Sequence, residues 1–308
     1  MGLEELRAAL GDKAIEGEPL SKHTTFGIGG PADLLVVAHT LPELRSYVRL
    51  AWEHQVQHVV LGSGANLLVG DRGIRGLVIR NECSAVEVSP GEHENSWLVN
   101  AESGAEISAV ARQAMAQGLA GLEWAVDVPG TVGGAVVGNA GAYGGYTSDN
   151  LQGVVVFSPT DGECWWPSSE LGLGYRTSIF KQKERVPGFS PVILSATFAL
   201  RTEDTAAIQE RAAEYSRRRK VRQPEGLSAG SIFKRTDQYP AGFLIENAGL
   251  KGKRVGGAIV SLQHANFIIN LGTATAQDVR ELIDLIRETV HAKFKVMLEL
   301  EIELVGEW

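Results

Sequence analysis

The stretch from Val128 to Gly145, VPGTVGGAVVGNAGAYGG, constrains the fold of this chain more than any other segment. Its glycines are Gly130, Gly133, Gly134, Gly138, Gly141, Gly144 and Gly145. Glycine reaches positive φ and permits close approach of the backbone, but it costs chain entropy, so a plain loop rarely concentrates it. The stretch has no charged side chain. We interpret it as a close-fitting wall of backbone N–H groups for a large planar or phosphorylated ligand.

The alternative interpretation of this stretch is a glycine-rich surface linker. Val132, Val136 and Val137 are interleaved with the glycines, and Pro129 stiffens the entry. These apolar and rigid residues favour a packed segment over a linker.

Composition bounds the class of protein. The chain has 308 residues, 44% hydrophobic and 21% charged, which suits a soluble globular protein of two or three domains. The net charge of −8 argues against generic nucleic-acid binding. There is no long apolar run and no apolar signal core, so we expect a cytoplasmic protein without a membrane segment. Cys83 and Cys164 predict neither a disulfide nor a metal site.

Periodicity predicts most of the elements. Helices are expected over 4–10, 41–54, 107–117, 205–220, 241–250 and 277–294. Strands are expected over 34–38, 59–61, 76–81, 97–101, 154–157, 191–200, 256–260 and 266–270. Apolar and acidic residues alternate in the last segment, VMLELEIELVG, which predicts one strand. One face would carry Leu298, Leu300, Ile302 and Leu304, and the other Glu299, Glu301 and Glu303.

A second ligand-binding candidate follows the expected strand at Val59–Leu61. It reads Gly62-Ser63-Gly64-Ala65-Asn66, a turn whose successive N–H groups can form an anion nest. It is neither a dinucleotide fingerprint nor a Walker motif, because no helix-opening G-x-G-x-x-G or GK[ST] is present. An ordinary tight turn would be the usual interpretation, but a second glycine-rich segment further on favours a ligand site.

Several motifs together resemble one family, the UDP-N-acetylenolpyruvoylglucosamine reductases, which are FAD enzymes of bacterial peptidoglycan synthesis. The matching motifs are HTTFGIGGPA, LGSGANLLV, VPGTVGGAVVGNAGAYGG, GYRTSIF, SAGSIFKR, AGFLIENAGLKGKRVGGAIVS, HANFIIN and LELEIELVG. They occur in the family's order along nearly the whole chain. The short distance from Gly174 to Ser231 resembles the type II form, which lacks the inserted loop with a substrate-clamping tyrosine. Gly27 and Lys295 depart from the family's pattern, which usually has a basic residue and a glycine there.

The resemblance implies an α+β fold: a two-lobed FAD-binding domain of the vanillyl-alcohol-oxidase/PCMH type plus a C-terminal α+β substrate-binding domain. We place the lobes at residues 1–80 and 81–215 and the substrate domain at 216–308. It also implies NADPH as co-substrate, FAD and UDP-N-acetylglucosamine enolpyruvate as ligands, and a monomer. No His or Cys lies in either glycine stretch, so we expect the FAD to be non-covalent. No metal is expected.

By the same resemblance, both glycine stretches hold the cofactor. Gly62 to Leu68 would bind the pyrophosphate, and Pro129 to Gly141 would line the ribityl chain and the flavin ring. The cofactor residues expected are Gly62, Ser63, Gly64, Ala65, Asn66, Leu67, Pro129, Gly130, Thr131, Gly133, Gly134, Ala135, Gly138, Asn139, Ala140 and Gly141.

Three residues carry the expected chemistry. Ser231 of SAGSIFK would protonate C2 of the enolpyruvyl group, although a serine in such a place is more often a cap or turn residue, and Ser228 is close. Arg176 would stabilise enolate charge, since its guanidinium stays cationic. Glu301 is favoured over Glu299 and Glu303 only by the family's motif, because alternation cannot choose among them.

Substrate-binding residues are expected in and after the basic run at Arg217–Arg222, which could also be a solvated helix end. They are Arg218, Arg222, Lys234 and His264, and Tyr175, beside Arg176, is expected to bind substrate as well. Two rival functions stay open at this point. One is another FAD-linked oxidoreductase of the superfamily, acting on an alcohol or sugar. The other is a nucleotide-sugar-binding or regulatory protein without turnover.

Overall fold

The computed structural model describes residues 2–181 and 191–308. The chain forms two compact units. The first comprises the described parts of Met1–Ile15, Leu35–Gly62 and Gly76–Arg219, and the second comprises Glu16–Leu34, Ser63–Arg75 and Lys220–Trp308. The chain therefore passes from one unit to the other five times.

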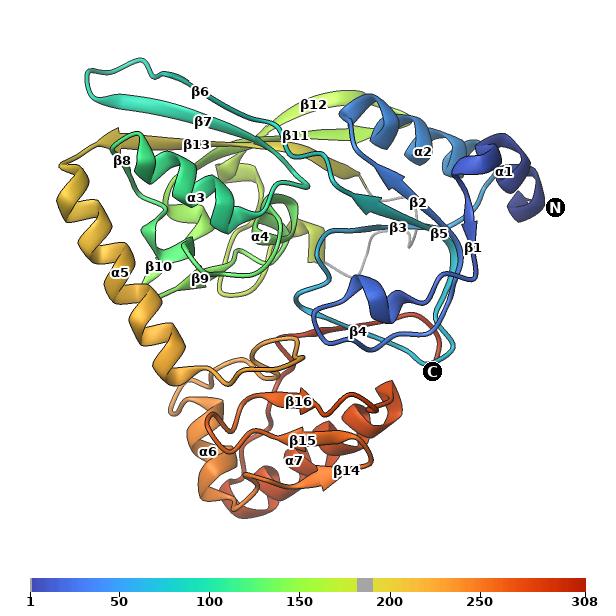
Figure 1. Ribbon diagram of the computed structural model, residues 1–308, viewed down its shortest axis with the longest axis vertical. Coiled ribbons are helices and arrows are strands. Elements are labelled where there is room, and N and C mark those ends of the chain that lie inside the picture. Colours follow the sequence, from blue (N-terminus) through green and yellow to red (C-terminus); the bar gives the residue numbers. More distant parts are fainter. Residues whose placement is uncertain (1, 182–190) are drawn as a thin grey trace. The chain divides into compact units, whose positions relative to one another are not determined.

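The first unit contains most of the regular elements (Figure 1). Its helices are α1 (Gly2–Leu10), α2 (Leu41–Glu53), α3 (Ile107–Ala116), α4 (Val132–Val137) and most of α5 (Thr205–Arg222). Its strands are β3 (His58–Leu61), β6 (Val86–Pro90), β7 (Ser96–Glu102), β8 (Leu119–Ala120), β9 (Gly141–Ala142), β10 (Gly145–Tyr146), β11 (Leu151–Ser158), β12 (Gly162–Pro167) and β13 (Val192–Thr202). Strands β1 (Ile15–Glu16), β2 (Ala32–Ala38) and β5 (Ile74–Asn81) begin in one unit and end in the other.

Two sheets organise this unit. The larger is antiparallel, with strand order β12-β11-β13-β7-β6 and β8 paired to β13. Helices α3 and α4 lie against it and share its apolar core, which includes Val110, Val136 and Phe198 (Figure 1). The smaller sheet has the order β1-β2-β5-β3, in which β3 and β5 are parallel. A parallel strand such as β3 ends at the sheet edge from which ligand-binding loops commonly leave.

The second unit has a core of its own. It contains β4 (Leu67–Val69), α6 (Ala241–Asn247), β14 (Arg254–Val255), β15 (Ala258–Val260), β16 (Ile268–Asn270), α7 (Ala276–Phe294) and β17 (Glu303–Val305). Strands β14-β15-β16 form an antiparallel sheet, and β4 pairs with β17 in parallel. Asp71 accepts hydrogen bonds from the N–H groups of Ala276 (2.8 Å) and Gln277 (3.0 Å), so a residue next to β4 caps α7.

Helices α2 and α7 form as their periodicity predicts. The apolar residues that recur at helical spacing along α2 are all buried: Leu44, Tyr47, Val48 and Ala51. The same holds for α7: Val279, Leu282, Ile283, Ile286 and Val290. Thr40 and Thr275 cap the two helices by accepting from backbone N–H groups three residues on. In the part of the chain that the structure describes, no helix is long and apolar enough to cross a membrane.

The prediction of one long terminal strand is wrong. Only β17 is a strand, and Leu304 is exposed although Leu298 and Ile302 are buried. The segment has two successive partners. Lys234 N–H donates to the Glu299 carbonyl at 2.9 Å, whereas β17 pairs with β4. The chain bends at residues 301–302 between these partners, so a single face is not maintained.

Candidate cofactor and active site

The loop Gly62–Asn66 follows β3, as predicted. Its glycines are required by neighbouring protein atoms. A Cβ on Gly62 would lie 2.4 Å from Thr131 Oγ1, and a Cβ on Gly64 would lie 2.5 Å from the carbonyl oxygen of His23. Gly64 also has φ of +64°, a conformation that L-residues adopt only with strain. The loop is therefore tightly fitted to its surroundings.

The polar groups of this loop have unused hydrogen-bonding capacity. Among the described residues, none accepts a hydrogen bond from the N–H groups of Ser63, Gly64, Ala65 or Asn66. The hydroxyl of Ser63 is buried and has no partner there either. Buried polar groups without partners are costly and rare, so they indicate a missing acceptor. A run of free N–H groups suits an anion with several oxygens, such as a pyrophosphate.

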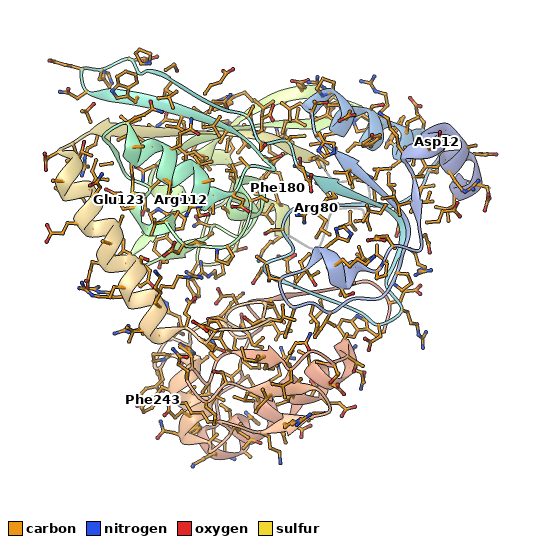
Figure 2. All side chains as sticks on the ribbon, in the orientation of Figure 1. Asp12, Arg80, Arg112, Glu123, Phe180 and Phe243 are labelled. Carbon is orange, nitrogen blue, oxygen red and sulfur yellow. The ribbon has the colours of Figure 1, made fainter. Side chains whose placement is uncertain are left out.

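Arg80 of β5 supports the same loop, since its Nη1 donates to the carbonyl oxygen of Gly62. Figure 2 labels Arg80 among the side chains. The bond holds the carbonyl of the first loop residue on the Arg80 guanidinium. The sequence analysis did not single out Arg80, because a basic residue in a strand has no motif of its own.

The central glycine stretch contains a short helix, α4, that was not predicted. Thr131 caps it by accepting from Gly134 N–H at 3.4 Å. The N–H groups of Val132 and Gly133 donate to the carbonyls of Ala105 and Ser103, both at 2.8 Å. This corrects the expectation that the whole stretch offers its backbone donors to a ligand. The helix forms despite poor glycine propensity because its cap and its packing on the sheet compensate.

What the central stretch offers instead is an uncovered surface. A Cβ on Gly130 would meet no atom within 4 Å, and one on Gly134 would meet only Thr131 Oγ1, at 3.5 Å. Gly138 follows at the same spacing of four, with its nearest neighbour at 3.4 Å. Gly134 and Gly138, four residues apart, share one face of α4, and Gly130 precedes the cap of this helix with φ of +126°, so none of the three adds a side chain to this surface. A Cβ on Gly133, by contrast, would lie 3.1 Å from Ser103, which is tighter than an ordinary contact.

Arg176 lies in the first unit in a tight turn closed by pairing of Gly174 with Thr177. Its φ is +55°, which is uncommon for a residue other than glycine and is often found at functional sites. Its Nη2 donates to the carbonyl of Gly141 at 3.0 Å, so the guanidinium is held against the central glycine stretch. Asn139 holds the turn as well, by donating to the Gly174 carbonyl at 3.0 Å.

Ser231 and Glu301 belong to the second unit, where the structure brings their segments together. Ser231 pairs with Phe267, and its neighbour Ile232 accepts from Glu301 N–H at 2.8 Å. Ile232 N–H in turn donates to the Asn266 carbonyl at 2.8 Å. Ser231 and Glu301 are both half-buried, whereas Glu299 is exposed and its carboxylate is 3.4 Å from the Lys234 ammonium. These environments distinguish Glu301 from Glu299, which alternation could not do.

The loop Gly62–Asn66 is joined directly to this pair of segments. Asn66 Nδ2 donates to the Glu301 carbonyl at 3.0 Å, and Glu303 N–H donates to the Asn66 carbonyl at 2.9 Å. All these atoms belong to the second unit. Ser63–Asn66 of the anion nest and the segments carrying Ser231 and Glu301 are therefore hydrogen-bonded parts of the same unit.

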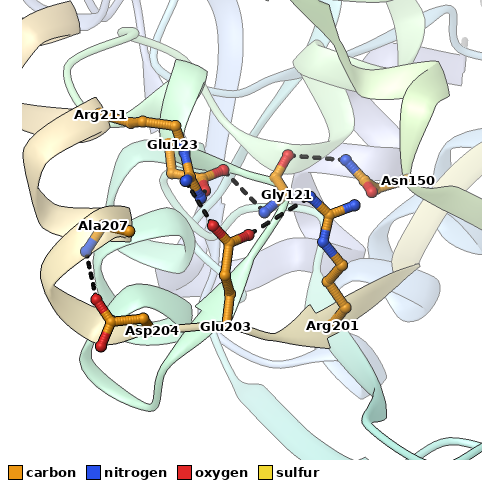
Figure 3. Close-up of polar contacts among 8 residues, drawn as sticks. All are labelled: Gly121, Glu123, Asn150, Arg201, Glu203, Asp204, Ala207 and Arg211. Atoms are coloured by element: carbon orange, nitrogen blue, oxygen red, sulfur yellow. Dashed lines mark hydrogen bonds and ion pairs between the residues drawn. The ribbon is translucent and has the colours of Figure 1, made fainter.

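The basic run lies on α5, which reaches Arg222, two residues further than expected. A network anchors this helix (Figure 3). Arg211 donates to the carboxylates of Glu123 and Glu203, each at 2.6 Å, and Glu123 also accepts from Gly121 N–H at 2.8 Å. The Arg211 guanidinium lowers the pKa of Glu203. Further along, Arg218 Nε donates to the Glu214 carboxylate at 2.6 Å, so Arg218 is already engaged.

The remaining substrate candidates differ in environment. Lys234 is half-buried beside Glu299, and Tyr175 is exposed with the Arg176 guanidinium 5.6 Å from its ring centre. His264 packs edge-on against Phe267, and its Nδ1 accepts from Asn266 N–H at 3.2 Å. Burial lowers the pKa of His264, so its neutral form is favoured. This environment favours a structural role for the imidazole.

Comparison with known proteins identifies the class of protein to which the chain belongs. Residues 32–167 match the family described as "FAD binding domain", which agrees with the anion nest and the glycine wall, and the chain is an α+β flavoprotein of the oxidoreductase class. Residues 223–305 match "UDP-N-acetylenolpyruvoylglucosamine reductase, C-terminal domain". The chain belongs to the UDP-N-acetylenolpyruvoylglucosamine reductase family.

Its relatives match over nearly their whole length. The reductase of Alkaliphilus oremlandii is 41% identical over 297 residues, covering 96% of this chain and 94% of the relative. The reductase of Exiguobacterium sibiricum is 43% identical over 291 residues, covering 94% and 92%. The crystal structure of UDP-N-acetylenolpyruvylglucosamine reductase from Thermus caldophilus has a TM-score of 0.79 at 37% identity, covering 94% of this chain and 98% of that one.

Proposed function

We propose that this protein catalyses the NADPH-driven reduction of UDP-N-acetylglucosamine enolpyruvate to UDP-N-acetylmuramate in peptidoglycan biosynthesis. The observation that carries the proposal is the bonding of the nest at Ser63–Asn66 to the segments of Ser231 and Glu301. An anion-binding loop and candidate proton-handling groups are thereby fixed together. The relatives share the full length of the chain, which disfavours an alcohol or sugar oxidase.

FAD would be held without a covalent bond by two sets of residues. The first set is Gly62, Ser63, Gly64, Ala65, Asn66 and Leu67, and the unengaged N–H groups of Ser63 to Asn66 suit the pyrophosphate. The second is Pro129, Gly130, Thr131, Gly133, Gly134, Ala135, Gly138, Asn139, Ala140 and Gly141, whose open glycine wall suits a flat ring. Held by these residues, FAD would supply the hydride chemistry between NADPH and C3 of the enolpyruvyl group.

Ser231 would supply the proton that C2 needs once C3 has received hydride. A serine hydroxyl is a weak acid, so it acts only where charge is stabilised nearby. Arg176 would provide that stabilisation toward the enolate and carboxylate oxygens, because a guanidinium stays cationic and binds carboxylates in two places. Glu301 would orient the substrate near C2. Arg218, Arg222, Lys234 and Tyr175 are the proposed substrate-binding residues, whereas the environment of His264 favours a structural role over substrate binding.

We further infer that the protein works as a monomer in the cytoplasm on small-molecule substrates. The net charge of −8 gives no basic footprint for nucleic acid. Light scattering of the purified flavoprotein would test the monomer directly: a mass near 33.1 kDa is expected, and a mass twice as large would contradict it.

Anaerobic half-reactions test the function. The flavin-bound protein should be bleached by NADPH, and its yellow colour should return on addition of UDP-N-acetylglucosamine enolpyruvate. UDP-N-acetylglucosamine, which lacks the enolpyruvyl group, is the matched control and should leave the flavin reduced. Colour returning equally with both compounds, or with neither, would rule out this reaction.

Ser231→Ala tests the proton donor within that reaction. Flavin reduction by NADPH needs no proton at C2 and should keep its rate, whereas reoxidation by the enolpyruvyl compound should slow by about 10²–10⁴-fold. Ser231→Cys should recover part of the loss, and Ser228→Ala should stay active. Equal slowing of both half-reactions would make the hydroxyl structural and assign protonation to another group.

A further inference from the structure

We propose that Thr25 is a positioning residue for proton delivery, which fixes the Ser231 loop relative to the cofactor loop Gly62–Asn66. The inference rests on the proposed function of Ser231 as the acid. It concerns a residue of the second unit that lies far from Ser231 in sequence and touches both loops.

Thr25 contacts each loop through a different group. Its backbone N–H donates to the carbonyl of Gly64 at 3.4 Å, and its hydroxyl donates to the carbonyl of Ser228 at 2.8 Å. The preceding residues, His23 and Thr24, pack so closely on Gly64 that no Cβ fits between them. The segment His23–Thr25 is therefore seated on the cofactor loop, and the Thr25 side chain reaches from there to the loop that carries Ser231.

The hydrogen bond from Thr25 to Ser228 restrains the backbone on the N-terminal side of Ser231. On its C-terminal side Ser231 is followed by Ile232, which is fixed by its bonds to Asn266 and Glu301. On the N-terminal side comes Gly230, which has φ of +78° and no atom within 4 Å of the Cβ position. Glycine gives this joint freedom. The Thr25–Ser228 bond is the side-chain tie nearest to that joint on the N-terminal side.

Asn66 makes a similar hydrogen bond to Glu301, the other proposed active-site residue of this unit. Its Nδ2 donates to the Glu301 carbonyl at 3.0 Å. The cofactor loop thus holds Glu301 through its own side chain and the Ser231 loop through Thr25. Thr25 suits this task because a β-branched side chain has few χ1 choices, so its hydroxyl stays directed at one acceptor. A hydrogen bond in a half-buried place is also stronger than one in water.

The closest neighbour in sequence provides a matched control. Thr24 is a buried threonine of the same motif, but its hydroxyl donates to the Ile28 carbonyl at 2.9 Å and not to the Ser231 loop. Thr24→Val and Thr25→Val make the same chemical change, each removing one hydrogen bond of similar length. Only the second releases the Ser228 carbonyl.

The test uses the FAD-bound protein and measures the two half-reactions separately by stopped flow. Thr25→Val should slow reoxidation by UDP-N-acetylglucosamine enolpyruvate by about 10–100-fold, because small misplacements of a reacting group are costly. Flavin reduction by NADPH should not change. Thr25→Ser, which keeps the hydroxyl, should restore reoxidation. Thr24→Val should slow neither step in the flavin-bound fraction.

The inference is overturned if Thr25→Val leaves reoxidation unchanged, slows both steps alike, or is not rescued by Thr25→Ser. Should Thr25→Val not bind FAD, Thr25→Ala, which adds no atoms, serves in its place under the same criteria.

A double variant separates this inference from the proposed function. If Thr25 acts through Ser231, then Ser231→Ala with Thr25→Val should reoxidise no more slowly than Ser231→Ala alone. If Ser231→Ala alone reoxidises normally, the assignment of the proton donor fails whatever Thr25 does. If Ser231→Ala is slow and Thr25→Val is not, only the positioning role fails.

Discussion

The two glycine-rich stretches use glycine for opposite reasons. In Gly62–Asn66 the glycines are forced by the protein, since a Cβ at Gly62 or Gly64 would overlap Thr131 or His23. Around α4, a Cβ on Gly134 would meet only Thr131 Oγ1, at 3.5 Å, whereas Gly130 is uncrowded but has φ of +126°, which itself favours glycine. A glycine without a protein neighbour to explain it indicates a ligand. The first stretch therefore shapes a set of N–H groups, and the second keeps a surface bare.

The largest expected effect that tests this contrast is at Gly64. Gly64→Ala combines backbone strain of about 1–2 kcal/mol with overpacking of about 1–3 kcal/mol. Urea unfolding of the flavin-free protein should therefore show a loss of about 2–5 kcal/mol. Gly144→Ala is the matched control, because Gly144 has φ of +91° but no atom within 4 Å of its Cβ position. It should lose only the strain, about 1–2 kcal/mol; equal losses at both positions would mean that the Gly64 overlap is relieved easily.

Gly134→Val should weaken FAD binding and leave the stability of the flavin-free protein nearly unchanged. The flavin-free protein should unfold within about 1 kcal/mol of the parent, because the added Cβ would meet only Thr131 Oγ1, at 3.5 Å. FAD affinity should fall by about a hundredfold, roughly 3 kcal/mol, because the side chain occupies ligand space. Flavin content and fluorescence titration measure this. The control is Gly133→Ala, which should lose stability against Ser103. Full FAD occupancy in Gly134→Val would break the contrast.

Neither glycine stretch has a basic side chain that could bind the UDP diphosphate of the substrate, whereas α5 has several. Arg222→Ala should then raise KM for the UDP substrate by an amount equivalent to about 1.5–3 kcal/mol, with little change in kcat. Arg218→Ala should have a smaller effect, because the Arg218 guanidinium is already paired with Glu214. Steady-state kinetics distinguish these outcomes. Unchanged KM in both variants would make the basic run a solvated helix end.

The smallest effect concerns a position where the backbone favours glycine and the chain has lysine. Lys295 ends α7 with φ of 59° and ψ of 26°, the left-handed conformation. Lys295→Gly should stabilise the protein by roughly 1 kcal/mol, since it removes strain but adds chain entropy. Thermal unfolding measures the gain. Lys295→Ala should give none, and a gain there equal to that of glycine would show that charge, not φ, decides.

The sequence predicts best what depends on local periodicity. The buried faces of α2 and α7 follow from apolar residues at helical spacing, and α3 ends at Ala116, one residue before its predicted end. Helix α4 was missed because glycine propensity argues against it, and only its packing and the Thr131 cap outweigh that. The prediction of one terminal strand failed because its two backbone partners, near Lys234 and at β4, lie 65 or more residues away in the sequence.

The candidate site shows the same division. Motif resemblance selected Ser231, Arg176 and Glu301, and the loop at Gly62–Asn66 could be inferred as a nest from its glycines. Which glycines are open, and which residues support the loops, could not be inferred. Thr25 and Arg80 act through carbonyl groups of distant residues, and such contacts leave no spacing pattern in the sequence.

The pairing of β4 with β17 has a consequence for the order of events during synthesis. Asn66 and Glu301 are separated by 235 residues. At bacterial translation rates of about 5–20 residues per second, the cofactor loop emerges roughly ten seconds to a minute before its supporting strand. Flavin uptake must then wait until the ribosome has passed β17. Ribosome-bound chains stalled before Glu303 should carry no FAD, and flavin on such chains would show that the loop is competent without its last strand.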